Sequence, residues 1–525
     1  MRLLLIVLLL VACLDASITR SPSSSLWGSF SGNNNVMEKV KNATANGIRK
    51  VVFVATVYFC FLTVYIQILD RTGLKKIHDK FLRMKGKILK TLQLSPKMLE
   101  SLNERLNKLR IIKIDKVNEQ GDSISEINAN VRSAEYLFQS DIALTKKQAD
   151  EIAEQIEEEA RGGNRTKRQA LKDQRNMGMM WTEGVNYFFD PSASEKMRRA
   201  FVKGARAWER DTCINFKEDS NAEDSIRVFP EYGCWSYTGK LGGQQELSLG
   251  GGCETEGMAA HEIGHALGFF HTMGRHDRDN YITVDIQNVK SNWLDQFTMA
   301  TPSTNENYGM EYDYGSIMHY GRTIGSINQK PTMIPFDTNY VETLGSPFIS
   351  FIDLSMMNEH YGCKAKCNPQ TSAKCSAGGF PHPRDCSRCI CPSGYGGALC
   401  NERPAGCGAI LNAKTEFQTL RDVIGEGGDT TEYFVKCHYW IQSPPGTRIE
   451  VKLESLTHGF AVDGCTYEGI EIKANHDHKL TGYRFCAPED AGMVLRSQGS
   501  NLVPIITYTR TARTETVLQY RYLNH

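Results

Sequence analysis

The chain has 525 residues, which is enough for about two to four ordinary domains, so a single compact domain is not expected. Its 61 Lys and Arg residues and 60 Asp and Glu residues leave a formal net charge of +1, and this balance argues against a nucleic-acid-binding protein. Charged residues make up 23% and hydrophobic residues 41%, fractions that disfavour wholesale disorder and a polytopic membrane protein.

Cysteine is distributed unevenly along the chain. Fourteen of the 16 cysteines follow residue 212, and eight of them lie within residues 363–407. An even number of closely spaced cysteines is typical of disulfide frameworks, which form in oxidising compartments. We therefore expect a secreted, extracellular protein.

Two apolar runs precede residue 70. Residues 1–16 have a basic start, an apolar stretch and a small final residue, the pattern of a secretory signal peptide. The second run, Val51–Leu69, has 19 residues without a charge, which is barely enough to span a bilayer. A stop-transfer helix at this place would leave the later cysteines in the cytosol. We expect the run either to be translocated or to act as a signal-anchor, and any membrane association to depend on it alone.

Residues 17–168 have the features of a propeptide. Ser101–Val117 and Thr145–Ala160 carry apolar residues at three- and four-residue spacing, which predicts amphipathic helices in a short bundle or coiled coil. A multibasic tract then ends at Arg168, and flexible basic segments of this kind are where proteases cut. We expect a proprotein-convertase-like protease to cut here, so that the mature chain begins at Gln169.

Two Asn-x-Thr sequons, at Asn42 and Asn164, predict N-glycosylation. Both precede the expected cut, so the mature protein would carry no N-linked sugar.

A histidine-rich segment after residue 256 contains the candidate metal-ligating residues. His261 and His265 are four residues apart, which on a helix places both imidazoles on one face, and Glu262 follows the first of them. Gly268 would break the helix and turn the chain back, so that His271 becomes a third ligand. Three imidazoles with an open position are the arrangement of a catalytic zinc site. We expect one Zn²⁺ per catalytic domain.

A tyrosine-rich segment, Tyr312–Tyr320, supplies two further candidates. Met318 offers an apolar, polarisable floor beneath a zinc–histidine site. Tyr320 can alternate between metal ligand and hydrogen-bond donor. His276 and His319 are interpreted as packing or hydrogen-bonding groups.

These two segments resemble those of the astacin family of metzincin zinc endopeptidases. The resemblance covers about residues 169–363 and implies an α+β metzincin domain with a zinc helix and a Met-turn. It further implies that the zinc ligands are His261, His265 and His271. By the same resemblance Glu262 is the general base and Met318 the Met-turn methionine. Tyr320 is implied to be an additional ligand that stabilises the transition state. The family usually has Glu directly after the third His, where this chain has Thr272.

The upstream residues Leu137–Thr145 are similar to the family's propeptide element Phe-x-Gly-Asp. This similarity implies that Asp141 is the latency ligand, which binds the catalytic zinc in place of water, and a carboxylate oxygen is an acceptable zinc ligand. Ser140 stands where the family prefers Gly, which makes a tight backbone approach less favourable.

In the protease region the sequence alone permits three pairings of four cysteines. The resemblance implies Cys213–Cys363 and Cys234–Cys253. Between them, Gln244–Leu249 is predicted to form an exposed edge strand to which an extended substrate could add.

Two smaller modules are expected after residue 363. Residues 364–401 resemble an EGF-like module, with a zinc ribbon as the alternative for closely spaced cysteines. The resemblance implies the pairs Cys367–Cys386, Cys375–Cys389 and Cys391–Cys400. Residues 407–525 alternate in hydropathy like a β-sandwich. They resemble a CUB domain with the pairs Cys407–Cys437 and Cys465–Cys486, and no calcium site is predicted.

The sequence predicts a secreted zinc endopeptidase, made as a zymogen, that cuts extracellular proteins. The family acts on matrix, cuticle or egg-envelope proteins and growth-factor precursors, and the sequence does not choose among these. A membrane-tethered protease of the same chemistry and an inactive extracellular binding protein are the alternatives.

Overall fold

The computed structural model describes residues 73–161, 179–302, 304–426, 431–457, 459–511 and 513–524. The chain divides into two compact units, Met1–Lys76 and Ile77–His525, and the sites discussed below lie in the second unit. The predicted signal peptide, the apolar run 51–69, both sequons and the Arg168–Gln169 junction fall outside the described residues. Within those residues, no helix has the length and apolar character needed to cross a membrane.

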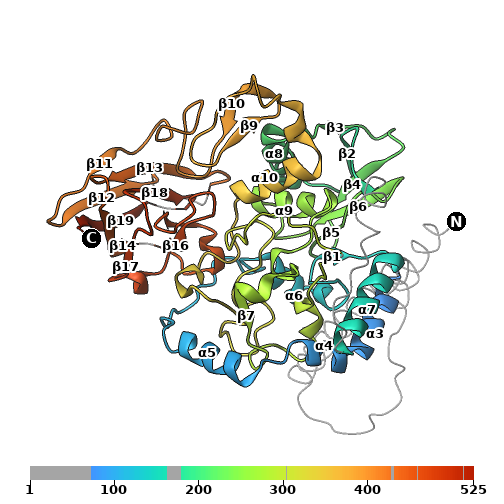
Figure 1. Cartoon of the computed structure of the whole chain (residues 1–525). Coiled ribbons are helices and arrows are strands. Elements are labelled where there is room, and N and C mark those ends of the chain that lie inside the picture. The colour runs from blue at the N-terminus through green and yellow to red at the C-terminus, as the bar shows by residue number, and fades with distance from the viewer. Residues whose placement is uncertain are drawn as a thin grey trace, which may run out of the picture. The chain divides into compact units, whose positions relative to one another are not determined.

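An N-terminal segment, residues 77–161, is mainly helical (Figure 1). Its predicted helix at Thr145–Ala160 is confirmed, because Thr145 and Gln148 form a capping box at the start of α7. Helix α7 packs against α4, and the ammonium of Lys87 lies 2.7 Å from the carboxylate of Glu157. The helices of this part of the chain are α3 (Leu74–Arg83), α4 (Lys85–Thr91), α5 (Pro96–Leu106), α6 (Ile124–Asn130) and α7 (Lys146–Ala160).

The predicted helix Ser101–Val117 is wrong in its second half. Helix α5 begins at the Ser95 cap with Pro96 in its first turn and ends at Leu106. Beyond it the backbone is irregular and finds partners far away in the sequence. The N–H of Asp115 donates to the carbonyl of Ala461, and the N–H of Ala461 donates to the Asp115 carboxylate. These tertiary contacts replace the helical hydrogen bonds that the periodicity predicted.

The central region, residues 179–362, supplies five strands of a six-stranded sheet of order β1-β5-β6-β4-β2-β3, and the N-terminal segment supplies β1. Strand β5 is antiparallel to β6, whereas the other neighbours run parallel. The strands are β1 (Ile142–Ala143), β2 (Val185–Phe189), β3 (Phe216–Glu218), β4 (Ser225–Phe229), β5 (Cys234–Tyr237) and β6 (Gln244–Leu249).

The prediction that Gln244–Leu249 is an edge strand is wrong. These residues form β6, which pairs with β5 on one side and β4 on the other. The strand nearer the edge is β5, and the short β1 of the N-terminal segment covers it by pairing Ile142 with Ser236. Alternating hydropathy identifies a strand but does not give its neighbours, because those depend on the order of strands in the sheet.

Helices α8 (Glu195–Asp211) and α9 (Glu256–Ala266) pack against each other beside the sheet (Figure 1). Their close approach depends on Gly204, where a Cβ would lie 2.8 Å from the backbone nitrogen of Ala260. The indole N–H of the fully buried Trp208 donates to the Ala260 carbonyl at 2.8 Å. This contact fixes α9, the helix that carries the first two histidines. The region also contains β7 (Ile282–Val284), β8 (Met333–Pro335) and α10 (Phe351–His360).

The remainder of the chain is rich in strands and disulfides. A hairpin of β9 (Phe380–His382) and β10 (Asp385–Ile390) is followed by two sheets of order β11-β13-β18-β15-β16 and β12-β19-β14-β17, here called the C-terminal sandwich. Its strands are β11 (Ile410–Asn412), β12 (Gln418–Ile424), β13 (Val435–Gln442), β14 (Arg448–Thr457), β15 (Glu468–Ile472), β16 (Tyr483–Phe485), β17 (Val494–Arg496), β18 (Leu502–Thr509) and β19 (Thr514–Leu523).

Cysteine pairing in the described residues follows the expected pattern. All six cysteines of residues 364–401 are in disulfides, which leaves none of them for a zinc ribbon. The disulfides are Cys213–Cys363, Cys234–Cys253, Cys367–Cys386, Cys375–Cys389, Cys391–Cys400, Cys407–Cys437 and Cys465–Cys486.

Candidate active site

Three histidines meet where α9 ends. Thr255 caps the helix, and His261 and His265 lie one turn apart on its inner face. The helix stops at Ala266, and Gly268 turns the chain with φ of +110°, a left-handed conformation that glycine adopts readily. The next turn places Nε2 of His271 3.2 Å from Nε2 of His261. The structure therefore brings together the three histidines that the spacing singled out.

The outer nitrogen of each imidazole is held by an oxygen acceptor. Nδ1 of His261 lies 2.6 Å from the Ile317 carbonyl, and Nδ1 of His265 lies 2.7 Å from the Phe269 carbonyl. Nδ1 of His271 lies 2.9 Å from the side-chain carbonyl of Gln139. Because a carbonyl oxygen only accepts, each Nδ1 carries the proton, and each Nε2 presents a lone pair to the centre of the cluster.

A carboxylate from the N-terminal segment completes the cluster. Asp141 is fully buried, and its oxygens lie 3.0 Å from Nε2 of His261, 3.2 Å from Nε2 of His271 and 3.4 Å from Nε2 of His265. One ligand atom from each of the four residues lies within 4.8 Å of the others.

The donor set fits a zinc ion. Nε2 of His265 and Oδ1 of Asp141 are buried and have no hydrogen-bond partner among the described residues, as expected of atoms that face a metal position. Burial lowers the pKa of His271 to about 3, which keeps the imidazole in its neutral, ligating form. Three imidazole nitrogens and one carboxylate oxygen are ligands that zinc accepts in tetrahedral sites.

Glu262 lies next to this cluster without joining it. It is fully buried, and neither carboxylate oxygen has a hydrogen-bond partner among the described residues. Burial, reinforced by the negative charge of Asp141, raises its pKa well above the usual range. A buried carboxyl group with free oxygens and a raised pKa can accept and return a proton.

Tyr320 also contacts Asp141. Its hydroxyl contacts the Asp141 carboxylate and accepts a hydrogen bond of 2.9 Å from the Ser140 hydroxyl. Its ring lies 4.3 Å from that of His271, centroid to centroid. Burial and Asp141 raise its pKa well above the usual range, so the phenol keeps its proton for donation.

The backbone before Asp141 is left-handed at two residues that are not glycine. Gln139 has φ of +45° and Ser140 has φ of +69°. The backbone nevertheless comes close to the histidine cluster with serine in place of glycine. Two hydrogen bonds hold Ser140 there: its hydroxyl donates to Tyr320, and its carbonyl accepts the side-chain amide of Asn128 at 2.9 Å. The roles of Gln139 and Asn128 were not identified from the sequence. For Gln139 the one available signal was its position two residues before Asp141, and Asn128 had no such signal.

The turn that carries Met318 packs against α9. A Cβ on Gly264 would lie 2.7 Å from the sulfur of Met318, so the helix and the turn are in close contact. Thr272, which stands in place of the family's Glu, donates its N–H to the Met318 carbonyl and its hydroxyl to Ser316, both at 2.9 Å. Asp353 in α10 accepts from the Ser316 hydroxyl and the Ile317 N–H. The contributions of Ser316 and Asp353 were also missed from the sequence.

A cleft of about 880 Å³ opens beside His261 and Tyr320. Its walls come from α8 and α9, from residues 345–349, from residues 117–124 of the N-terminal segment and from residues 431–436 of the C-terminal sandwich. The cleft thus offers a concave site of the size typical of ligand-binding pockets next to the histidine cluster.

Comparisons with known proteins agree with this geometry. The family model for astacin, peptidase family M12A, matches residues 173–362. Zinc metalloproteinase nas-31 of Caenorhabditis elegans is 47% identical over 409 residues, which cover 78% of this chain and 67% of that protein. Zinc metalloproteinase nas-29 of the same organism is 34% identical over 430 residues, which cover 78% of this chain and 79% of that protein.

Among solved structures, the chain is similar to high choriolytic enzyme 1, a hatching enzyme zinc-protease from Oryzias latipes (medaka fish). The two are 34% identical, the match covers 34% of this chain and 88% of that chain, and the TM-score is 0.32. The family match and the nas relatives share the segment that contains the histidine cluster. The chain therefore belongs to the astacin family and is a zinc metalloendopeptidase.

Proposed function

We propose that the chain is a secreted endopeptidase that is made in a latent form, in which Asp141 occupies the position that the attacking water needs. The observation that carries this proposal is the contact of one buried carboxylate with all three histidines and with Tyr320. A substrate carbonyl and a water molecule cannot share that space with Asp141.

We assign residues 1–16 to a signal peptide and residues 17–168 to a propeptide that is removed after Arg168. Residues 169–363 form the peptidase domain, residues 364–401 an EGF-like module and residues 407–525 a CUB domain. The disulfides of the last two modules and the sandwich topology support these assignments.

We assign zinc binding to His261, His265 and His271. Zinc supplies Lewis acidity and makes water a nucleophile near neutral pH. Once Asp141 has left, the carboxylate of Glu262 takes a proton from the attacking water and passes it to the leaving amine. The hydroxyl of Tyr320, freed from Asp141, donates a hydrogen bond to the oxyanion of the tetrahedral intermediate. Met318 supports the histidines from below.

The propeptide blocks the enzyme at a second place as well. Its strand β1 follows Asp141 directly and pairs with β5, so it occupies the edge of the sheet nearest the site. Removal of residues 17–168 would free this edge for an extended substrate, which could pair with β5 as β1 does. We expect extracellular proteins of matrix, cuticle or egg-envelope type as substrates.

The test uses the full chain, secreted and correctly oxidised. Elemental analysis should find one zinc per chain, and cleavage of a quenched fluorescent peptide should rise when a protease that recognises the multibasic tract cuts after Arg168. A chelator should abolish this activity and added zinc should restore it. A chain without stoichiometric zinc, or one whose activity does not change on cleavage, would contradict the proposal.

A further inference from the structure

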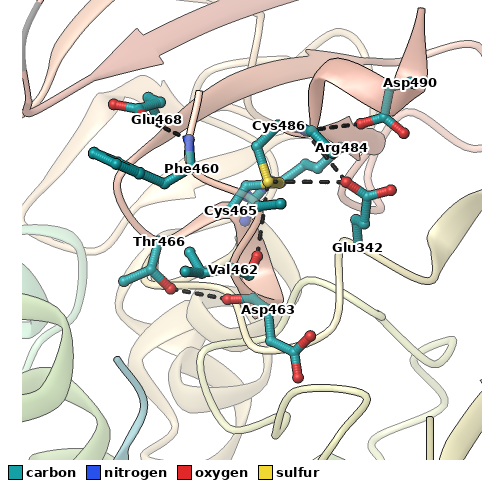
Figure 2. Close-up of a disulfide and its surroundings, with 12 residues drawn as sticks. Glu342, Phe460, Val462, Asp463, Cys465, Thr466, Glu468, Arg484, Cys486 and Asp490 are labelled. Atoms are coloured by element: carbon teal, nitrogen blue, oxygen red, sulfur yellow. Dashed lines mark hydrogen bonds between the residues drawn. A yellow bond between two sulfur atoms is a disulfide. The ribbon is translucent and has the colours of Figure 1, made fainter. Parts of the chain in front are cut away.

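Two carboxylates from distant parts of the chain meet at a buried site, here called the Glu342–Asp490 pocket, which the Arg110 guanidinium fills in this structure. Glu342 belongs to the peptidase domain and Asp490 to the C-terminal sandwich, and their exposed fractions are 1% and 0%. Figure 2 shows both carboxylates beside the Cys465–Cys486 disulfide. Burial and the neighbouring charge of Asp490 raise the pKa of Glu342 to about 8. Two like charges in this position require a cation or a proton between them.

The cation in this structure comes from the N-terminal segment. Nη2 of Arg110 lies 2.7 Å from Oδ1 of Asp490 and 3.2 Å from Oε1 of Glu342. The guanidinium carbon lies 5.4 Å from the centre of the Phe485 ring, within the range of a cation–π contact. Oδ1 of Asp490 has no hydrogen-bond partner among the described residues, so the ion pair with Arg110 is the contact that compensates the charge of this buried oxygen.

The pocket is held in shape by contacts that do not involve Arg110. The second oxygen of Asp490 accepts the N–H of Ala487 at 3.0 Å, and the second oxygen of Glu342 accepts the N–H of Cys486 at 3.4 Å. Two further guanidinium groups nearby have partners of their own, since Arg322 is paired with Asp463 at 3.1 Å and Arg484 with Glu471 at 3.1 Å. One oxygen of each carboxylate is thus left for an incoming cation.

The sandwich is in direct contact with the peptidase domain at this place. The guanidinium of Arg484 donates to the Ser346 hydroxyl at 2.6 Å, and the Arg484 N–H donates to the Thr343 hydroxyl at 3.1 Å. A Cβ on Gly464 would lie 1.9 Å from the Gly345 carbonyl, so the two backbones are in direct contact.

A single stretch of irregular backbone connects this pocket with the catalytic cleft. From Arg110 the chain runs past Asp115, which bonds to Ala461, and then along the cleft wall at residues 117–124. Gly345 and Ser346 line the cleft three and four residues after Glu342. A substrate bound in the cleft can therefore reach the pocket with a flanking segment.

We infer that the Glu342–Asp490 pocket is a secondary binding site for substrate, which takes an arginine side chain from a segment flanking the scissile bond once the propeptide has left. This inference rests on the proposed removal of residues 17–168, because Arg110 leaves with them. Arginine suits the pocket better than lysine does. Its planar fork can contact two carboxylates at once and lie against the Phe485 ring, whereas an ammonium is a compact point charge.

The first experiment needs no variant of the enzyme. A fluorescent peptide that copies residues 107–117 is titrated onto enzyme that has been activated and freed of its propeptide, and a second peptide carries citrulline, a neutral isostere, at the Arg110 position. The arginine peptide should bind about tenfold more tightly or better, because only it carries a charge at the position that faces the buried carboxylates. Equal affinities would overturn the inference.

The second experiment addresses substrates directly. Intact matrix proteins are digested with activated enzyme and with the double variant Glu342→Gln/Asp490→Asn, and the new N-termini are mapped. The sequences around wild-type cleavage sites should be enriched in arginine at a preferred distance, and the double variant should lose that enrichment. The exposed neighbour Glu489 supplies the matched control, and Glu489→Gln should keep it. Identical arginine frequencies for wild type and double variant would mean that the pocket serves only the propeptide.

A short fluorescent peptide without arginine separates the two proposals. The wild-type enzyme and Glu489→Gln should cut it at similar rates, and a cooperative thermal unfolding transition shows whether the double variant is folded. If the wild-type enzyme failed to cut it, the proposed function would be wrong, whereas the peptide titration would still report on the pocket.

Discussion

The side-chain carbonyl of Gln139 accepts a hydrogen bond of 2.9 Å from Nδ1 of His271. The Gln139 amide is itself held by the Thr298 carbonyl at 3.0 Å, so the acceptor is fixed in place. A partner on Nδ1 sets the tautomer and orientation of a ligating histidine. In the latent chain, this partner belongs to the segment that maturation is proposed to remove.

Replacement of Gln139 by Leu should weaken zinc binding in the latent chain by about 10–100-fold, the usual effect of losing such a partner. Competition with a chelating dye measures the affinity. After propeptide removal, the variant and the wild-type enzyme have the same sequence and should bind zinc equally. Unchanged affinity in the latent chain would show that Gln139 does not position His271.

Replacement of Asp141 by Ala should activate the uncut chain. Without this carboxylate, the fourth position opens to water and the Tyr320 hydroxyl is released, so hydrolysis of a fluorescent peptide should increase about tenfold or more. Asp150 is a control of the same type, because it lies on α7 and pairs with Lys80 and Lys146. Asp150→Ala should stay latent. Equal basal rates for Asp141→Ala and wild type would remove Asp141 from its proposed role.

Replacement of Glu262 by Gln should leave zinc bound and lower kcat by about 10²- to 10⁴-fold, the range attributed to general acid–base catalysis. Zinc content by elemental analysis and single-substrate kinetics of the activated enzyme give both readouts. Glu218, exposed in β3 and not among the residues that line the cleft, supplies the control Glu218→Gln. Full activity of Glu262→Gln would show that a group other than Glu262 acts as the general base.

Replacement of Thr272 by Val should destabilise the protein by about 1–3 kcal/mol, because the variant loses the buried hydrogen bond from Thr272 to Ser316. Thr272→Ser keeps the hydroxyl and should restore most of the loss. Thermal unfolding measures both variants. Equal melting temperatures for Thr272→Val and Thr272→Ser would show that the Thr272 hydroxyl does not stabilise the contact between the His271 loop and the turn at Ser316.

The stability of the C-terminal sandwich should fall between pH 6.5 and pH 4. Burial, with the nearby charge of Lys473, lowers the pKa of His478 to about 4, and its Nδ1 lies 2.6 Å from the Tyr395 hydroxyl. In this pH range the unfolded chain binds a proton that the folded chain does not, so acid favours unfolding.

Melting temperatures at pH 7.5 and pH 5 test this expectation. The difference between them should be smaller in His478→Phe than in wild type, whereas His476→Phe, at an exposed neighbour, should keep the full difference. An unchanged difference in His478→Phe would assign the acid sensitivity to other groups.

The sequence by itself determined the chemistry. His261, Glu262, His265, Gly268 and His271 lie close together along the chain, and the geometry of one helix and one turn decides where their side chains point. The same holds for the helix that begins at Thr145. Local hydrogen bonds govern such features, so residue spacing is sufficient to predict them.

Only the tertiary structure decided the relationships between distant segments. Gln139 on His271, Thr272 on Ser316, and Arg110 between Glu342 and Asp490 join residues that no periodicity connects. The same reason explains why two predictions were wrong, the edge strand at Gln244–Leu249 and the helix beyond Leu106. The neighbours of β6 and the path of residues 107–117 depend on which surfaces fold against them. Burial and partner choice belong to the packed molecule, because desolvation acts only after segments far apart in sequence have met.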